Sequence, residues 1–121
     1  MSLATLMSYA GVSDTTARKS SWISMDQMTG GIGLTMVADG TLAGSWKIET
    51  TTNPAALTSV APADDPADIT SGFSPTIASV VGDGGTTAKQ FAQISSVKSG
   101  FFRVSFAPTS GSGGVRVHIA Y

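Results

Sequence analysis

At 121 residues, the chain is long enough for one domain with a substantial hydrophobic core and too short for two. Hydrophobic residues make up 41% of it, which predicts a folded chain, whereas charged residues make up only 12%, about half of the roughly 25% usual in soluble domains. The net charge of −1 includes no basic cluster, so we expect no nucleic-acid binding, and the absence of cysteine excludes disulfides, thiolate metal sites and thiol nucleophiles.

Ser, Thr, Gly and Ala replace the missing charged residues. Lys and Glu are depleted where proteins bury area together, so a surface this poor in them resembles an interface. An ordinary Ser/Thr-rich β-protein would have the same composition, and composition alone does not separate the two interpretations.

The beginning of the chain differs from the rest, because residues 13–20 lack a clean period of two or of 3.6 residues. We interpret residues 1–20 as an N-terminal arm and residues 21–121 as a β-sandwich domain. Four apolar side chains of the arm would be costly to leave in water, namely Leu3, Leu6, Met7 and Tyr9. We therefore expect the arm to dock on a neighbouring subunit or on its own sandwich, and we predict that it contacts another chain.

Targeting and membrane signals are not evident in the sequence. Residues 1–11 carry no Lys or Arg and only a short hydrophobic stretch, which does not resemble a signal peptide. No apolar run approaches the ~20 residues that span a bilayer, so we expect no membrane partner.

Strands are predicted from residue 22 onward. Residues 22–28 alternate without defining a buried face, and a Gly-Gly turn follows at residues 30–31. Residues 32–37 alternate again before the strong tight-turn signal Ala-Asp-Gly at residues 38–40. Residues 41–51 form the clearest strand of this half, with one face made of Leu42, Gly44, Trp46 and Ile48.

The middle of the chain is more irregular. Residues 52–68 are rich in Pro, Ala, Asp and Thr and are expected to form a long loop or lid. Residues 69–81 predict a short strand and a helical turn, and residues 82–85 form a Gly-rich turn. Residues 89–95 predict a strand whose alternation does not decide which face is buried.

Two alternating segments, residues 101–107 and 115–121, close the chain on either side of a Ser/Gly-rich stretch. This pattern predicts an antiparallel β-hairpin with one buried face. With the C-terminal residues committed to a core strand, we expect no catalytic or signalling segment there. The predicted core of this hairpin consists of Phe102, Val104, Phe106, Val117 and Ile119.

The whole pattern gives roughly seven or eight short strands, with turn signals about every eight to twelve residues outside the long loop. This spacing favours a sandwich or jelly roll over a helical or α/β fold. The predicted fold is all-β: an antiparallel β-sandwich, jelly-roll-like, with an N-terminal arm.

Several short motifs follow one another in a characteristic order along the chain. A Gly-containing strand that ends in Trp46-Lys47-Ile48-Glu49 is followed by a loop, further strands and a closing Ser/Gly-rich turn. The motifs lie within residues 38–121 and include Asn53, Asp68-Ile69-Thr70, Phe102-Arg103-Val104 and Gly111-Ser112-Gly113-Gly114-Val115. This order resembles the small jelly-roll or β-sandwich virion proteins of tailed bacteriophages. By size, the chain is most similar to capsid cement (decoration) proteins, while tail-associated sandwich modules also resemble it.

Catalytic and metal-binding signals are weak. His118 is the only histidine and lies on the polar side of its strand, so we interpret it as a surface or interface residue. Asp64, Asp65 and Asp68 lack the spacing of a calcium loop and are interpreted as a solvated loop. The two Gly-rich turns lack the Lys-Ser/Thr of phosphate loops. We therefore predict no catalytic residues, no metal site and no cofactor.

The two tryptophans allow a structural or a binding interpretation. Trp46 shares a face with Leu42 and Ile48, which favours core packing with a satisfied indole N–H. For Trp22, core or rim packing and an exposed stacking position both stay open. The residues expected to contact partners are Leu3, Leu6, Met7, Tyr9 and Trp22.

The resemblance and the charge-poor composition together predict a non-enzymatic protein. The resemblance implies a structural virion protein, a cement protein on the capsid surface that binds the major capsid protein and sister subunits as a homo-oligomer. The alternative is a carbohydrate-binding or tail adhesin module. Binding to undecorated shells, or to a polysaccharide, distinguishes the two.

Overall fold

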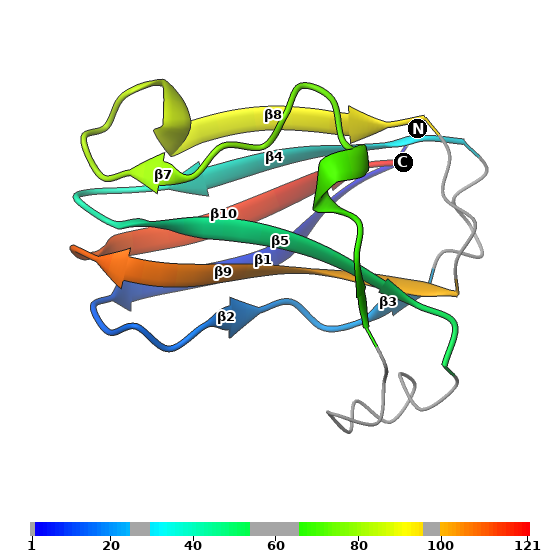
Figure 1. Ribbon diagram of the computed structural model, residues 1–121, viewed down its shortest axis with the longest axis horizontal. Coiled ribbons are helices and arrows are strands. Elements are labelled where there is room, and N and C mark those ends of the chain that lie inside the picture. The colour runs from blue at the N-terminus through cyan, green and yellow to red at the C-terminus, as the bar shows by residue number, and fades with distance from the viewer. Residues whose placement is uncertain (1, 25–29, 54–65, 96–99) are drawn as a thin grey trace.

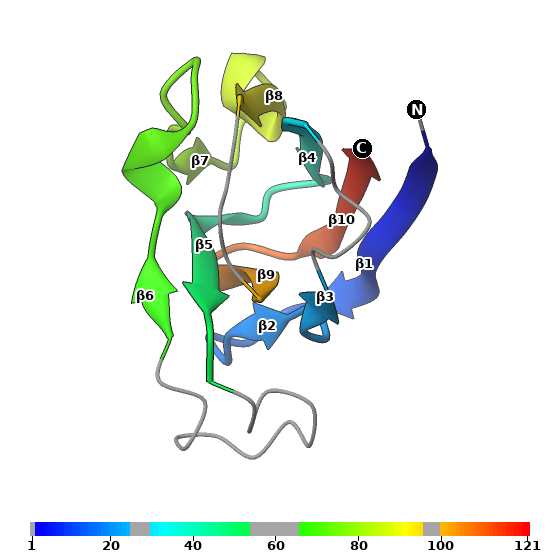
Figure 2. The same cartoon turned by 90° about the vertical axis from the view of Figure 1, so that its right-hand side faces the viewer.

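The computed structural model of the protein describes residues 2–24, 30–53, 66–95 and 100–121. These residues form two antiparallel sheets that pack face to face, as Figures 1 and 2 show. The predicted all-β sandwich is confirmed. In strand order, the first sheet contains β1 (Leu3–Val12), β10 (Gly113–Ala120), β4 (Ile32–Ala38) and β8 (Lys89–Ile94).

The second sheet is built around two long strands, with short strands at both of its edges. Its main path runs through β2 (Arg18–Lys19), β9 (Phe101–Ser110), β5 (Ala43–Thr51) and β6 (Ala67–Asp68). Outside this path, β3 (Ile23–Ser24) pairs with β9, and β7 (Val80–Val81) pairs with β5. Two short 3-10 turns, η2 (Thr70–Gly72) and η3 (Thr86–Ala88), belong to the connections.

The core lies between the sheets and is built by alternation along each strand. Alternate apolar side chains of β9 and β10 are almost fully excluded from water, namely Phe102, Val104, Phe106, Val115, Val117 and Ile119. Trp46 is also in the core, with its ring centroid 4.6 Å from that of Phe106, although its Nε1–H has no hydrogen-bond partner among the described residues. The largest fully buried side chains are Phe102, Phe106, Leu34, Met36, Leu42, Ile48, Val12, Val104, Val115 and Val117.

The predicted C-terminal hairpin is wrong, because β9 and β10 belong to different sheets. β9 pairs with β5 from Phe101↔Thr51 to Ser110↔Ala43, whereas β10 pairs with β1 and β4. The turn between them crosses from one sheet to the other at Gly111, where φ is +76° and a Cβ would meet the Thr41 carbonyl oxygen. The two buried faces therefore oppose each other across the core instead of lying side by side.

The described residues of the segment interpreted as an arm pair with the chain's own sandwich, one of the two expected docking sites, and are strands of its sheets. Leu3–Val12 forms β1, which pairs along its length with β10, and Arg18–Lys19 forms β2 of the second sheet. Met7 and Val12 are buried in the core. Two register shifts interrupt the β1–β10 ladder, so the segment does not show a simple period of two.

Two further predictions fall partly outside the described residues. Of the strand expected over residues 22–28, the structure describes β3, Ile23–Ser24, and residues 25–28 lie outside the described residues. Most of the loop expected over residues 52–68, including Asp64 and Asp65, lies outside them as well. The strand expected over residues 89–95 is β8, and its buried face is the one that carries Ala92.

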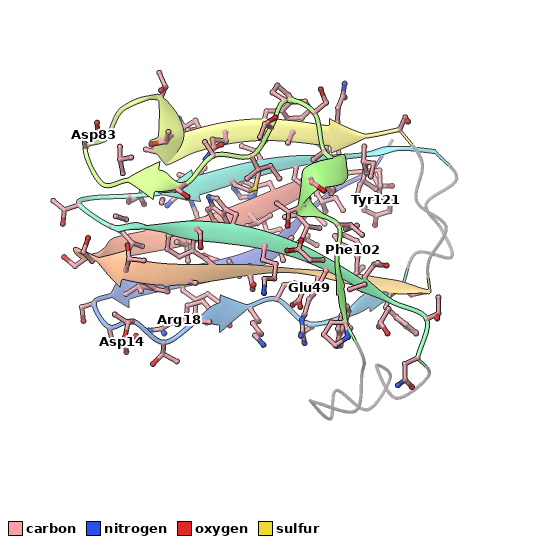
Figure 3. The ribbon with its side chains drawn as sticks, in the orientation of Figure 1. Asp14, Arg18, Glu49, Asp83, Phe102 and Tyr121 are labelled. Atoms are coloured by element: carbon pink, nitrogen blue, oxygen red, sulfur yellow. The ribbon has the colours of Figure 1, made fainter. Side chains whose placement is uncertain are left out.

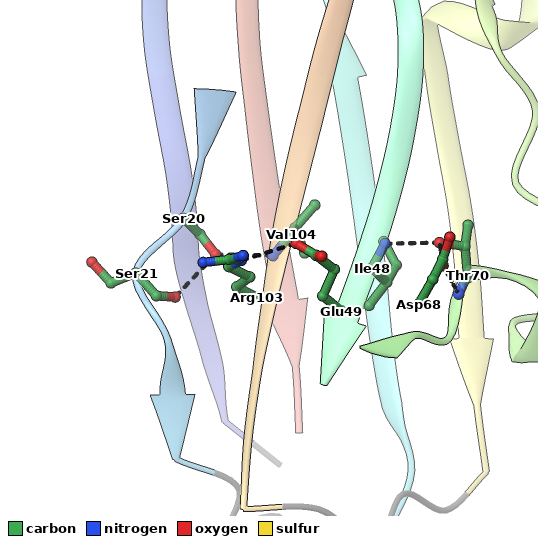
Figure 4. A network of polar contacts seen from close by, with 8 residues as sticks. All are labelled: Ser20, Ser21, Ile48, Glu49, Asp68, Thr70, Arg103 and Val104. Carbon is green, nitrogen blue, oxygen red and sulfur yellow. Dashed lines mark hydrogen bonds and ion pairs between the residues drawn. The ribbon is translucent and has the colours of Figure 1, made fainter. Parts of the chain in front are cut away.

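A bulge separates β2 from β3, and a serine hydroxyl fills the gap it leaves in the ladder. Three residues, 20–22, stand between Lys19↔Ser105 and Ile23↔Phe102, where β9 supplies only two. The buried Ser20 donates its N–H to the Val104 carbonyl oxygen at 2.8 Å, and its Oγ accepts the Val104 N–H at 3.0 Å (Figure 4). The side chain thereby satisfies a buried backbone donor of β9.

Replacing Ser20 with alanine should therefore lower the free energy of unfolding by about 1–3 kcal/mol, since the Val104 N–H would lose its acceptor. Denaturant unfolding of purified protein measures this change. Ser21→Ala is the matched control, because Ser21 is exposed and lies next to Ser20 in the same bulge. Equal stability of the two variants would show that the Ser20 hydroxyl does not support β9.

Candidate interaction surface

The outer face of the first sheet has a shallow apolar hollow of about 370 Å³. Gly33 of β4 and Ala120 of β10 lie in its lining, and neither has a side chain beyond Cβ. Leu3 of β1 and Phe91 of β8 line it from the two outer strands and are 78% and 53% exposed. The sheet therefore presents two large apolar side chains beside bare backbone.

Phe91 lies against Gly33, which explains how an exposed ring is positioned. A Cβ added at Gly33 would lie 3.0 Å from Phe91 Cε1, so the glycine leaves the space that the ring occupies. In the ladder, Phe91 opposes Thr35, and Gly33 opposes Gln93 two residues farther along on the same face. The Phe91 ring therefore reaches diagonally across the strands to Gly33. Its orientation depends on the absence of a side chain at Gly33.

A second hollow of about 680 Å³ adjoins the first and shares Gly33, Phe91 and Ala120 with it. It extends past Ile94 towards Ser74, which forms a β-bridge with β8. Among the described residues, neither lining contains an Asp, Glu, Lys or Arg side chain. Together the two hollows form an uncharged apolar face, which we call the Phe91 face.

Polar groups within the Phe91 face are few. His118 is exposed on β10, as predicted, and its Nδ1 lies 3.0 Å from Thr5 Oγ1 on β1. On the same side of the sheet, the exposed Lys89 lies two residues before Phe91 on β8, and Arg116 contacts Asp39 at 2.5 Å farther along β10. The face thus offers apolar contact with a small number of hydrogen-bonding groups.

The outer face of the second sheet differs, because it carries a nearly buried ion pair. Arg103 of β9 opposes Glu49 of β5 in the ladder, and its Nε lies 2.9 Å from Glu49 Oε1 (Figure 4). The half-buried Trp22 ring lies over the guanidinium, 4.2 Å from the ring centroid to Cζ. Trp22 therefore packs as a cover on Arg103, a cation–π arrangement, instead of standing open to solvent.

Asp68 and Thr70 complete this row of polar contacts (Figure 4). Thr70 donates both its hydroxyl and its N–H to Asp68 Oδ1, at 2.5 and 2.9 Å, while its Oγ1 accepts the Ile48 N–H at 2.8 Å. The hydroxyl bond, followed by the backbone bond, lowers the pKa of Asp68 below its ordinary value of 3.8. Through Thr70, Asp68 thus links the turn after β6 to β5, which is a structural role.

This lowered pKa predicts a small loss of stability in acid. A carboxyl group whose pKa is lower in the folded than in the unfolded state stabilises the folded state at any pH above the unfolded pKa. This contribution disappears as the pH falls through the folded pKa. Melting temperatures of wild type and Asp68→Asn should therefore differ at neutral pH and converge below about pH 3.8. A difference that stays constant with pH would contradict this role of Asp68.

The predicted partner-contacting residues are divided between different places. Leu3 lies in the Phe91 face, whereas Leu6 is half-buried and Met7 is a core residue with 4% exposure. Tyr9 lies towards the far end of β1, where its hydroxyl donates to the Lys19 carbonyl oxygen at 2.9 Å and Arg18 Cζ lies 5.9 Å from its ring centroid.

Arg18 in turn pairs with Asp14 at 2.9 Å (Figure 3). Tyr9, Arg18 and Asp14 thereby close the edge between the sheets, and only Leu3 of the predicted set is on the Phe91 face.

The described residues contain no group of three or more His, Asp or Glu side chains that could hold a metal ion. In the same part of the chain, no helix has the length and apolar character needed to cross a membrane. In comparisons with known proteins, the chain matches no family model, no curated protein and no solved structure.

Proposed function

We propose that the protein is a structural virion protein of a tailed bacteriophage, a cement protein that binds the capsid surface across neighbouring coat subunits. The observation that carries the proposal is the uncharged Phe91 face, with Leu3 and Phe91 exposed by 78% and 53%. Exposed apolar patches on an otherwise ordinary domain mark interaction sites. The proposed partners are the major capsid protein and sister subunits.

The strand order supports a jelly-roll assignment. β2 and β3 both pair with β9 and count as one interrupted strand, and β6 and β7 both pair with β5 and count likewise. Eight strands then remain. When these are numbered 1 to 8 along the chain, the first sheet has the strand order 1-8-3-6 and the second has the order 2-7-4-5. Every connection crosses between the sheets except the one from the fourth to the fifth strand, which is the jelly-roll connectivity of many capsid-associated domains.

An uncharged contact face suits attachment to a symmetric shell. Each copy forms a modest apolar contact, and repetition by symmetry makes total binding strong through multivalency. Because the described residues of the Phe91 face include no Asp, Glu, Lys or Arg, binding should change little between low and high salt. Strong salt dependence would instead point to the charged residues elsewhere on the surface.

The experiment mixes purified protein with undecorated shells of the coat protein encoded by the same genome, and measures occupancy and heat resistance. Phe91→Asp should lose occupancy, because it places a charge in the apolar face. Val81→Asp is the matched control, since Val81 is also exposed, by 61%, and lies on β7 of the second sheet. Equal loss in both variants, or no wild-type binding, would contradict the proposal.

One observation favours the second candidate, a carbohydrate-binding adhesin. The exposed Phe91 ring lies beside hydrogen-bonding groups of Thr5, Thr35 and His118 in one hollow, an arrangement that could stack on a sugar. Affinity for a polysaccharide that Phe91→Ala abolishes, together with failure to bind shells, would support this candidate over the first.

A further inference from the structure

The four sheet edges are protected to very different degrees. The second sheet ends in β2 and β3 on one side and β6 and β7 on the other, all only two residues long. Such short edge strands offer little for another chain to pair with. The two edges of the first sheet are longer, because β8 has six residues and β1 has ten.

Neighbouring residues of the same chain cover the β8 edge. Ser74 and Gln93 exchange two backbone hydrogen bonds of 2.9 Å, and the Gln90 side chain bonds both the N–H and the carbonyl oxygen of Ala78. Among the described residues, no strand pairs with the outer edge of β1, which is ten residues long. Figure 2 shows β1 at the outer edge of its sheet.

The sequence of β1 lacks most of the features that prevent pairing at an edge. Leu3–Val12 contains no charged residue and no proline, and its protection consists of two register shifts that follow Thr5 and Tyr9. The run Leu3–Ala4–Thr5 before the first shift is a regular ladder opposite Ala120, Ile119 and His118. This run is the part of the edge best suited to accept another strand.

The hydrogen-bonding direction in this run follows from its first pair. Ser2 and Tyr121 exchange both backbone hydrogen bonds, with the Tyr121 N–H donating to the Ser2 carbonyl oxygen at 2.9 Å. In an antiparallel ladder such pairs alternate with pairs that do not bond, so Ala4 faces β10 and the N–H and C=O of Leu3 and Thr5 face outward. Two donors and two acceptors therefore point away from the sheet.

We propose that this edge pairs with the same edge of a second copy of the chain. The two β1 strands run antiparallel about a twofold axis at Ala4, so that Leu3 of each copy opposes Thr5 of the other. The four outward donors and acceptors of each copy are then satisfied by four hydrogen bonds in total, and the two first sheets become one continuous sheet.

Charge and exposure favour a second copy as the occupant. Twofold antiparallel pairing places a strand against itself, so a charged strand would bring like charges close together, whereas β1 carries none. Among the described residues, Leu3 is the most exposed large apolar side chain, at 78%. In this register the two Leu3 side chains are diagonal neighbours, about 7–8 Å apart, on the same face, and each is partly covered by the other. The pairing therefore reduces the exposure of the side chain that the isolated copy leaves most exposed.

Sedimentation equilibrium of the purified full chain, from micromolar to millimolar concentration, tests the proposal without any shell. We expect reversible monomer–dimer association, weakened about tenfold or more by Leu3→Lys, because two lysines would then lie near the axis. Val81→Lys is the matched control, an equivalent change at an exposed apolar residue of the second sheet, and should associate like the wild type.

Hydrogen exchange provides a second measurement that does not depend on the variants. Protection of the Leu3 and Thr5 amides should increase with protein concentration, while that of Val81 should not. A wild type that stays monomeric at all concentrations, or a dimer that Leu3→Lys leaves unchanged with no added protection at Leu3 and Thr5, would overturn the proposal. Neither result bears on shell binding through the Phe91 face, so the two proposals can fail separately.

Discussion

Phe106→Ala is expected to lower the free energy of unfolding by about 3–5 kcal/mol, because it leaves a cavity between the sheets that the surroundings fill only in part. Phe106 is fully buried, lies opposite Trp46 in the β5–β9 ladder and packs against its ring at 57° between the ring planes. Its ring also occupies the space left by Gly44, where a Cβ would lie 2.6 Å from Phe106 Cζ. The side chain therefore fills space beside two residues of β5.

Chemical denaturation of the purified variant measures this effect, and Phe91→Ala is the matched control. The same atoms are removed at Phe91, but its ring is 53% exposed, so a much smaller loss is expected. Val104→Ala, at another fully buried position of β9, should also be destabilising. Comparable stability of Phe106→Ala and Phe91→Ala would mean that Phe106 does not pack as described.

The buried faces of the strands could be predicted from the sequence, whereas their partners could not. Alternation with a period of two predicts which side chains are buried. It correctly identified the core residues Phe102, Val104, Phe106, Val117 and Ile119. The same alternation arises whether two strands lie side by side or face each other across a core. The Ser/Gly-rich stretch was therefore interpreted as a hairpin turn, although it carries the chain from one sheet to the other.

β1 was not predicted as a strand of the sandwich, because its register shifts break the period and because its core contribution is small. Met7 and Val12 are buried, but Leu3 and Tyr9 are exposed and Leu6 is half-buried, so apolar residues appear on both faces. An uncharged apolar segment without regular alternation indicates association in general. Such a segment does not indicate whether it associates with another chain or with its own sheet. In this protein the inner edge of β1 pairs with β10 of the same chain.

The candidate surface was only partly predictable. Leu3 was expected to contact a partner, but Phe91 was not, because the pattern of residues 89–95 leaves either face available for burial. The decisive residue is Ala92, a small side chain whose burial places Phe91 on the outside. The Arg103–Glu49 pair joins residues far apart in the chain, and only the β5–β9 register brings them together.

Deleting residues 1–12 is expected to abolish cooperative folding, because this segment is a strand of the first sheet. The deletion removes the whole of β1, its ladder with β10 and the buried side chains of Met7 and Val12. It also exposes the edge of the strand that contributes the fully buried Val115 and Val117. Burial of each side chain contributes about 1.5–3 kcal/mol, and the total stability of a domain is only about 5–15 kcal/mol.

Far-UV circular dichroism and thermal melting of the truncated chain measure this outcome, and a synthetic peptide of residues 2–12 added in trans should restore part of the transition. A truncated chain that melts within a few degrees of the wild type would show that β1 is dispensable and would revive the arm interpretation. If the truncated chain unfolds, its failure to bind shells says nothing about contacts of the N-terminal segment. Point changes at the exposed Leu3 and Phe91 are then the informative ones, because both alter the surface while leaving the buried side of the first sheet intact.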